Sequence, residues 1–356
     1  MIKLSAGRCR LLSATLAATA TFTLPLAAQT ESAEKEAVTF ALTLENDVFA
    51  GTDQGYTNGT RFSWDFAEAA SYDDIEALPG WARFLTSPAT SADQDGSQTF
   101  GATISLGQNI YTPENKETTE LILDDRPYAG WTYLSLALRE RDRRHEDTFE
   151  ITLGVVGPDS FAEDVQNWVH EKIGSTEARG WDNQLKNEFG GIISWRRETE
   201  LFSPLESSDN WGADMSGTYG LAVGTIQTFA HAGANLRIGY NRSLALNAPR
   251  IIAGAASSFP SAADDPRLGE PASRRGIFLT LGAEGRYVAR NIFIEGNTWS
   301  DSHGLEAEPW VADYYASITA VSGDWSLAYV YTRRTKEFDQ QDGPHEFGGL
   351  TLAHSF

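Results

Sequence analysis

One histidine in the sequence is placed where it could activate water. Residues 161–173 (FAEDVQNWVHEKI) repeat apolar side chains at the spacing of an amphipathic helix. Gln166 and His170 are four residues apart, so they lie on one face of this predicted helix. A histidine beside a polar amide could act as the general base of a hydrolytic reaction. The alternative is a surface histidine without a catalytic role.

A second group of side chains could bind a cation. Residues 45–47 (Glu-Asn-Asp) end one predicted strand, and residues 56–59 (Tyr-Thr-Asn-Gly) begin the next. A hairpin would bring the two groups to the same level. Their carboxylate, amide and hydroxyl oxygens are the ligands that a hard cation such as calcium prefers. Because Asn, Asp and Gly are also ordinary turn residues, simple turn formation is the alternative.

The loop that the sequence predicts at 109–130 contains a third candidate. Lys116 could contact a phosphate group. Arg126, in the run DDRPYAG, is expected instead to pair with a neighbouring carboxylate as part of the structure. Trp181, which follows the predicted helix, is expected to anchor the return of the chain to the wall.

The sequence lacks the motifs of several other catalytic mechanisms. The sequence has no Gly-x-Ser-x-Gly segment, no glycine-rich phosphate-binding loop and no histidine pair with the spacing of a zinc site. Its single cysteine, Cys9, lies in the predicted N-terminal signal. Water activated by a histidine is therefore a better hypothesis than a serine or cysteine nucleophile.

These candidate residues must be positioned by β-strands. Apolar residues alternate with small, polar or charged ones in many segments, and this period of two is typical of strands with one apolar face. Twelve strands are predicted, at residues 38–46, 57–66, 99–108, 131–140, 147–156, 187–199, 213–226, 230–241, 276–288, 310–321, 324–334 and 346–356. Residues 291–299 are interpreted as a bent extension or a loop, because a bacterial barrel with both termini in the periplasm needs an even number of strands.

The expected fold class is all-β, a transmembrane antiparallel β-barrel with a short helix in an extracellular loop, rather than a soluble sandwich. Residues 1–28 have the composition of a signal peptide, and residues 29–356 would form the barrel. Aromatic residues cluster near strand ends, and the chain ends on Phe356, as outer membrane barrels commonly do. The connections at 67–98 and 242–275 would be long and periplasmic, and the second is expected to be flexible.

The balance of charge argues against one class of partner. The chain has 28 Lys and Arg against 49 Asp and Glu, a formal net charge of −21. We therefore expect no nucleic acid partner. Metal cations are suitable partners, although carboxylates that simply keep loops solvated explain most of the acidity. We expect the protein to be a monomer.

Four motifs in combination resemble the outer-membrane lipid A 3'-O-deacylase family, the LpxR-like proteins. They are LENDVFAGTDQGYTNG (44–59), DDRPYAGW (124–131), GVVGPDSFAEDVQNWVHEKIG (154–174) and GWDNQLKNE (180–188). GRYVARNIFIEGNTW (285–299) and the closing strand also fit, so the resemblance covers nearly the whole chain after the predicted signal. It implies a twelve-stranded barrel with a calcium-dependent esterase site between the outside of the barrel and the helix of an extracellular loop.

The resemblance also implies roles for single residues. His170 would take a proton from water, and Gln166 and Asn46 would complete the catalytic group. Lys116 and Tyr56 would contact the substrate.

The calcium ligands implied by the resemblance are Asp47, Thr57 and one glutamate. In the family this glutamate lies just past the helix, where direct alignment places Thr176 and where Glu177 is one residue away. The bound ion would polarise the ester carbonyl and stabilise the oxyanion.

The expected function is hydrolysis of the 3'-linked acyl ester of lipid A, the lipid part of lipopolysaccharide, by an enzyme of the bacterial outer membrane. One alternative is a non-catalytic barrel that serves as a pore or a structural protein. The other is an esterase that acts on phospholipid.

Overall fold

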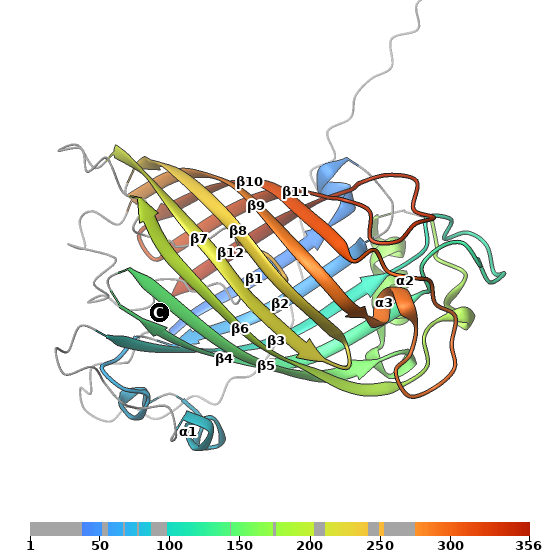
Figure 1. Cartoon of the computed structure of the whole chain (residues 1–356), viewed down its shortest axis with the longest axis horizontal. Helices are drawn as coiled ribbons and strands as arrows, with labels where there is room; N and C mark the ends of the chain where they lie inside the picture. The colour runs from blue at the N-terminus through green and yellow to red at the C-terminus, as the bar shows by residue number, and fades with distance from the viewer. Residues whose placement is uncertain are drawn as a thin grey trace, which may run out of the picture. The chain divides into compact units, whose positions relative to one another are not determined.

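The computed structural model of the chain is a closed antiparallel β-barrel (Figure 1). It describes residues 38–51, 56–66, 68–76, 78–86, 98–142, 144–173, 176–202, 211–240, 249–252 and 275–356. The predicted signal peptide at 1–28 lies outside the described residues.

Twelve strands make up the barrel in the part of the chain that the structure describes. Each strand pairs with its neighbours in the sequence, and the first strand pairs with the last. The strands are β1 (Val38–Asn46), β2 (Tyr56–Phe66), β3 (Thr99–Tyr111), β4 (Ala129–Arg141), β5 (His145–Val156), β6 (Glu188–Phe202), β7 (Trp211–Gly224), β8 (Gln227–Tyr240), β9 (Arg275–Asn291), β10 (Trp310–Ser322), β11 (Trp325–Arg334) and β12 (His345–Ser355). All twelve predicted strands are confirmed, with ends shifted by a few residues.

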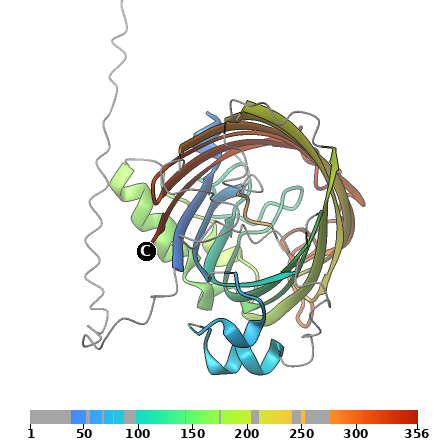
Figure 2. The same cartoon turned by 90° about the vertical axis from the view of Figure 1, so that its left-hand side faces the viewer.

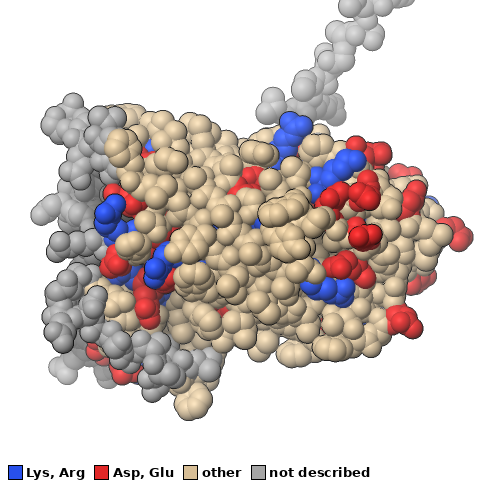
Figure 3. Space-filling view, in the orientation of Figure 1, with Lys and Arg blue, Asp and Glu red and all other residues tan. Residues whose placement is uncertain are grey.

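The alternation of residue types decides which face of each strand points outward. In β1, Thr39, Ala41 and Thr43 point into the lumen and are at most 3% exposed. Large apolar side chains on the opposite face are exposed, such as Leu279 on β9, which is 43% exposed, and Leu352 on β12, which is 44% exposed. Figure 3 shows the result on one side of the barrel, where Lys, Arg, Asp and Glu gather towards the two ends. An apolar face that points outward fits lipid as the surrounding medium and contradicts a soluble sandwich.

The barrel has two different ends. β1 begins and β12 ends at one of them, here called the terminal end, and the other is called the loop end (Figure 1). The loop end carries η1 (Asp47–Ala50), η3 (Pro158–Ser160), α2 (Ala162–Ile173), η4 (Trp181–Asn183) and α3 (Ile292–Glu295). In the described residues no helix is long and apolar enough to cross a membrane.

The segment at 291–299 is not a thirteenth strand. β9 continues to Asn291, whose side chain accepts a hydrogen bond from the backbone N–H of Phe293, and α3 follows directly. His345 begins β12, and His231 lies inside β8.

The connection between β2 and β3 folds onto the outside of the barrel at the terminal end. It contains η2 (Tyr72–Asp74) and α1 (Gly80–Thr86). Tyr72, Leu78 and Ala82 pack with the outward-facing Phe100 and Leu136 in one buried cluster. This cluster holds α1 outside the ring of strands, as Figure 2 shows.

The connection between β8 and β9 does not match the prediction of flexibility where it is described. Residues 249–252 lie in the barrel lumen, and Arg250 is 3% exposed. Arg250 and Ile251 are hydrogen bonded to wall residues. The rest of the predicted flexible segment lies outside the described residues.

Candidate functional site

Polar side chains interrupt the apolar outer face of the barrel near the loop end. On β3, the outward positions run from Ile104 and Leu106 to Gln108. Gln108 pairs with Thr60 of β2 on one side and with Thr132 of β4 on the other. Together with Asn46 and Asn58, these outward-facing residues are called the outer-wall patch: Asn46, Asn58, Thr60, Gln108 and Thr132.

The outer-wall patch binds the turn that leads into α2. The Gln108 Nε2 donates to the carbonyl oxygen of Ser160 at 2.7 Å, and the Thr132 hydroxyl donates to the same oxygen at 2.7 Å. Gly130, beside them on β4, allows the turn to approach the wall. A Cβ at this position would overlap the side chains of Ser160 and Ala162. The first residues of α2 are therefore fixed against the outside of β3 and β4.

α2 turns its polar face towards the barrel. Ala162, Gln166 and His170 follow each other at intervals of four, and they are 1%, 2% and 7% exposed. Phe161 and Trp168 are 65% and 57% exposed on the other side. This confirms the predicted helix and the shared face of Gln166 and His170, and it places α2 outside the ring of strands (Figure 2).

The residue before α2 has an unusual backbone. Phe161 has φ of 56°, and among the described residues it is the one non-glycine with positive φ. Such a conformation costs about 1–3 kcal/mol, so it persists only where the surrounding structure enforces it. Residues of this kind are found most often at functional sites. Here the bonds of Ser160 to the wall enforce the turn.

A tryptophan orients the Gln166 amide. The Trp181 indole N–H donates to Gln166 Oε1 at 3.0 Å, and Trp181 packs in one buried cluster with Ile110, Tyr128 and Ala162. This confirms that Trp181 anchors the chain after the helix. With Oε1 engaged, Gln166 Nε2 is a buried donor without a protein partner, and Asn167 Oδ1 on the next residue is a buried acceptor without one in the described chain. Buried polar atoms of this kind indicate a water or a ligand.

β1 ends at Asn46, at the level of the outer-wall patch, and Asp47 begins η1. Asn46 continues the outward face of Leu42 and Leu44, and its Oδ1 caps η1 by accepting from the Val48 N–H at 2.8 Å. Asp47 is 1% exposed. A buried carboxylate thus lies one residue beyond a capping amide.

Tyr56 and Thr57 lie opposite this turn, at the start of β2. Tyr56 pairs with Tyr111 and Asn58 pairs with Ile110, so the register shifts at Thr57. An extra residue of this kind forms a β-bulge, which bends the strand and redirects side chains. The hairpin therefore brings residues 46–47 and 56–58 to one end of neighbouring strands, as the sequence predicts.

Lys116 and Glu177 differ in their surroundings. Lys116 is 8% exposed, and its carbonyl accepts from the Tyr128 hydroxyl at 3.0 Å and from the Arg179 N–H at 2.9 Å. These bonds join the β3–β4 loop to the segment after α2. Glu177 is exposed, as is Thr176, so the structure does not bury it with the candidate calcium ligands.

The predicted pair of Arg126 is confirmed, but its partner is distant in the sequence. Arg126 donates to Glu337 at 2.7 Å, from the β3–β4 loop to the β11–β12 loop. Burial alone would raise the pKa of Glu337, but Arg126 and Arg334 lower it to about 2. The pair is thus an ionised link between two loops.

The donor set at the end of β1 suits a hard cation with few carboxylate ligands. In the described residues no group of three or more His, Cys, Asp and Glu side chains could hold a metal ion. Asp47 supplies one carboxylate, and Asn46 supplies an amide oxygen in the same turn. Calcium accepts such mixed oxygen ligands together with backbone carbonyls and water.

Comparisons with known proteins agree with the barrel. A family model described as "Outer membrane protein LpxR" matches residues 11–356. No match was found among curated protein sequences. The structure is similar to that of LpxR from Salmonella typhimurium, with a TM-score of 0.69 and 15% identity over 89% of this chain and 99% of that chain.

Two autotransporter barrels match less well. The β-domain of BrkA from Bordetella has a TM-score of 0.40 and 10% identity over 90% of this chain and 98% of that chain. The translocator domain of NalP from Neisseria meningitidis has a TM-score of 0.38 and 9% identity over 92% and 90%.

Proposed function

The chain belongs to the LpxR family of outer membrane proteins, and we propose that it is a lipid A deacylase that hydrolyses the 3'-linked acyl ester. Its family and its barrel place it in the bacterial outer membrane. The family also supports a protein that modifies lipid A. The ester that is cut, the catalytic residues and the calcium ion are parts of the proposal.

The observation that carries the proposal is the buried polar face of α2. Among the described residues, Gln166 Nε2 and Asn167 Oδ1 are buried atoms without a protein partner, and they lie beside the buried His170 on a helix that covers the outer-wall patch. A purely structural helix on a membrane barrel would bury apolar residues against the wall instead. On this helix Gln166 and His170 face inward beside Ala162, whereas the large apolar Trp168 is exposed.

In the proposed reaction, His170 accepts a proton from water as the water oxygen adds to the ester carbonyl carbon. The bond from that carbon to the sugar oxygen then breaks. His170 returns the proton to the sugar oxygen, which gives a free fatty acid and a sugar hydroxyl. Gln166 orients the water or the ester through Nε2, because Trp181 holds the other end of its amide. Asn46 faces the same outer side of the wall.

Two further groups would bind the substrate or a cation. Lys116 and Tyr56 would contact the lipid A headgroup, where a lysine can pair with phosphate. Asp47, Asn46 and Thr57 would hold calcium, whose chemistry when bound is to polarise the ester carbonyl. Glu177 is exposed and is the weakest of the proposed ligands.

The location of the site favours entry from the membrane. The outer-wall patch is on the lipid-facing side of β1 to β4, directly above outward apolar residues such as Leu106. A lipid in the outer leaflet could therefore reach α2 by moving sideways along the wall, without passing through the lumen.

Mass spectrometry of lipid A tests the function. Lipid A from cells that express the protein should lose one acyl chain relative to cells that lack it, and purified protein should release the same fatty acid. Release of fatty acid from phospholipid but not from lipid A would show the phospholipid esterase. Release from neither would show the non-catalytic barrel.

Calcium removal tests the cation. We expect a calcium chelator to abolish fatty acid release and added calcium to restore it. Asp47→Asn should lose the response to calcium, whereas Asp342→Asn, an exposed loop-end carboxylate, should keep it. Full activity in the chelator would remove calcium from the proposal and leave the role of His170 standing.

A further inference from the structure

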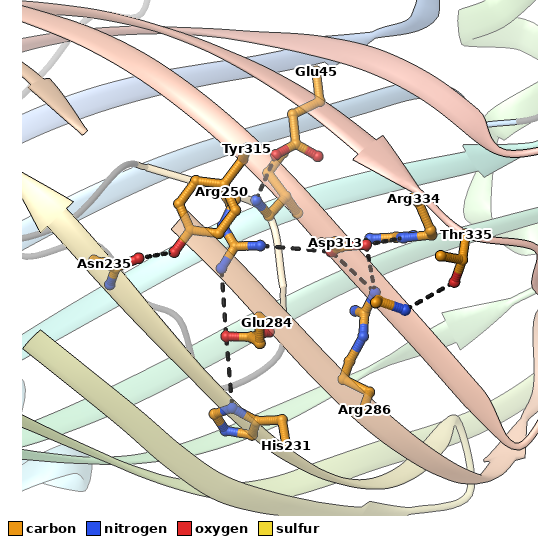
Figure 4. A network of polar contacts seen from close by, with 12 residues as sticks. Glu45, His231, Asn235, Arg250, Glu284, Arg286, Asp313, Tyr315, Arg334 and Thr335 are labelled. Carbon is orange, nitrogen blue, oxygen red and sulfur yellow. Dashed lines mark hydrogen bonds and ion pairs between the residues drawn. The ribbon is translucent and has the colours of Figure 1, made fainter. Parts of the chain in front are cut away.

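A short segment crosses the barrel lumen. Residues 249–252 belong to the connection between β8 and β9, which starts and ends at the terminal end of the barrel. In Figure 4 this segment runs between the strands, and the Arg250 side chain meets the side chains of β9 and β10. Nothing in the proposed deacylation requires a segment at this position.

Arg250 is held by two carboxylates and an aromatic ring. Its guanidinium lies 3.4 Å from Glu284 and 3.5 Å from Asp313, and it stacks over the Tyr315 ring at 3.9 Å from the centroid. All three partners point inward from β9 and β10, and Arg250 itself is 3% exposed. A buried arginine that lost these partners would carry an uncompensated charge, which is strongly unfavourable.

The backbone of the segment is fixed to the opposite wall. The Arg61 guanidinium on β2 donates to the Arg250 carbonyl at 3.2 Å, and the Ile251 N–H donates to Glu45 on β1 at 2.7 Å. The segment is thus bonded to β1 and β2 on one side and to β9 and β10 on the other. It spans the lumen rather than lining one wall.

The segment reaches deep into the barrel. Glu284 is the tenth of the 17 residues of β9, counted from the terminal end. At this level the inward-facing side chains are buried, for example Arg61 at 4% and Asp313 at 1%. A continuous water-filled channel would leave them exposed. A cavity of about 50 Å³ lies beside the segment.

We propose that residues 249–252 form an internal plug that closes the barrel to solutes, and that Arg250 is the residue that holds the plug in place. The twelve strands alone would enclose a polar lumen, and the plug fills it with a charge network that the wall completes. Asp313 also pairs with Arg286 and Arg334, and Glu284 also pairs with Arg196, so Arg250 joins two wall clusters into one.

Conductance measurements test the plug. Purified wild-type protein in planar lipid bilayers should show no ion current steps. Arg250→Glu places a negative charge against Glu284 and Asp313, so the segment should leave the lumen and current steps should appear. The matched control is Arg196→Gln, which removes the other arginine on Glu284, at 2.9 Å, but leaves the segment bonded and should stay closed.

Two results would overturn the plug: steady wild-type current, or a folded Arg250→Glu protein that stays as closed as wild type. Folding is checked by the heat-dependent shift in gel mobility that membrane barrels show.

A second measurement uses the wild-type protein alone. Trypsin cuts after exposed arginines, and a plug protects the Arg250–Ile251 bond because Arg250 is buried. Mass spectrometry of trypsin-treated, folded protein should find this bond intact, whereas heat-denatured protein should be cut there. Rapid cleavage in the folded protein would overturn the plug independently of any variant and of the deacylase activity.

Discussion

Two polar side chains of α2 are buried, although burying a polar group costs free energy unless it is hydrogen bonded. Gln166 and His170 are 2% and 7% exposed, and the Trp181 indole satisfies one end of the Gln166 amide. Leaving a buried donor without a partner costs about 1–3 kcal/mol. The fold tolerates this cost at Gln166 Nε2, and a bound water or ester that accepts its hydrogen bond would remove the cost.

At His170 we predict that the Asn variant loses activity but not structure. His170→Asn keeps a polar side chain of similar size but cannot take up a proton, so fatty acid release should fall about 10²–10⁴-fold. His145→Asn is the control, because His145 lies at the terminal end of the barrel, where its side chain is 41% exposed. Near wild-type release by a folded His170→Asn protein would exclude His170 as the base.

The ionised state of Glu337 leads to a prediction about the stability of the folded protein at low pH. Burial alone would raise its pKa, but Arg126 and Arg334 lower it to about 2, below the usual value of a glutamate. A carboxyl whose pKa is lowered by folding stabilises the folded state above its unfolded pKa. This contribution is lost as the pH falls from about 4.5 towards 2.

The midpoint of the heat-dependent gel shift should therefore fall in wild type over this pH range. Glu337→Gln should have a lower midpoint than wild type at neutral pH, because Arg126 loses its charged partner, and the difference should shrink towards pH 2. Glu120→Gln, at an exposed carboxyl of the β3–β4 loop, should follow wild type throughout. A constant difference between wild type and Glu337→Gln at all pH values would contradict the assignment.

Spacing along the chain was enough to predict some of these residues. The interval of four placed Gln166 and His170 on one helix face, and the ends of two predicted strands placed residues 45–47 and 56–59 at one level. Gln108 and Thr132 were missed, although each is a polar residue at a position where the alternation calls for an apolar one. The Glu337 partner of Arg126 is 211 residues away, and no local pattern predicts such a pair.

At the scale of elements, strands were predictable and short helices were not. A strand in lipid must expose apolar residues at every second position, so the period of two marks its whole length. α1 and α3 have seven and four residues, too few for a helical period to appear. The lumen segment was misjudged for another reason: the predicted connection at 242–275 is rich in Ala, Ser, Pro and Asp, as loops are, and only contacts with distant strands fix residues 249–252.

The docking of α2 on the wall gives a prediction at this scale. Gly130→Ala adds a Cβ that overlaps Ser160 and Ala162, so the start of α2 should move away from β4. Overpacking of this kind typically costs about 1–3 kcal/mol, and because the strain falls on α2, we expect activity to fall more than the midpoint of the heat-dependent gel shift.

Gly285→Ala is the matched control for Gly130→Ala. Gly285 is also an outward-facing strand glycine, but an added Cβ there meets only the Ala232 carbonyl oxygen at 4.0 Å. Its activity and stability should equal those of wild type. Unchanged activity in Gly130→Ala would show that the close contact of the turn with β4 is not needed for catalysis.

As a whole, the molecule is asymmetric around its axis. α1 covers the outer face of β3 and β4 at the terminal end, and α2 covers the outer face of the same strands at the loop end. On β3 only Ile104 and Leu106 face lipid between the two, because Phe100 packs against Tyr72 in the cluster that holds α1, and Ile110 packs under α2. On β9, by contrast, outward residues are exposed from Ile277 to Tyr287. One wall is therefore specialised, and the proposed site belongs to it.

This asymmetry predicts that a charge on the specialised wall harms activity and that the same charge elsewhere does not. Leu106 lies two residues before Gln108 on β3 and is 45% exposed. Leu221 on β7 is 46% exposed. An arginine on the lipid face costs about 2–4 kcal/mol at the membrane centre and less near its surface, so both Leu106→Arg and Leu221→Arg should still fold. If lipid A approaches sideways along β1 to β4, only Leu106→Arg places a strongly hydrated cation among the acyl chains that must slide past.

Fatty acid release in proteoliposomes that contain lipid A should then fall in Leu106→Arg and stay near wild type in Leu221→Arg. Equal losses in both variants would mean that the charge disturbs the bilayer in general. Full activity in Leu106→Arg would mean that the substrate reaches α2 by another route.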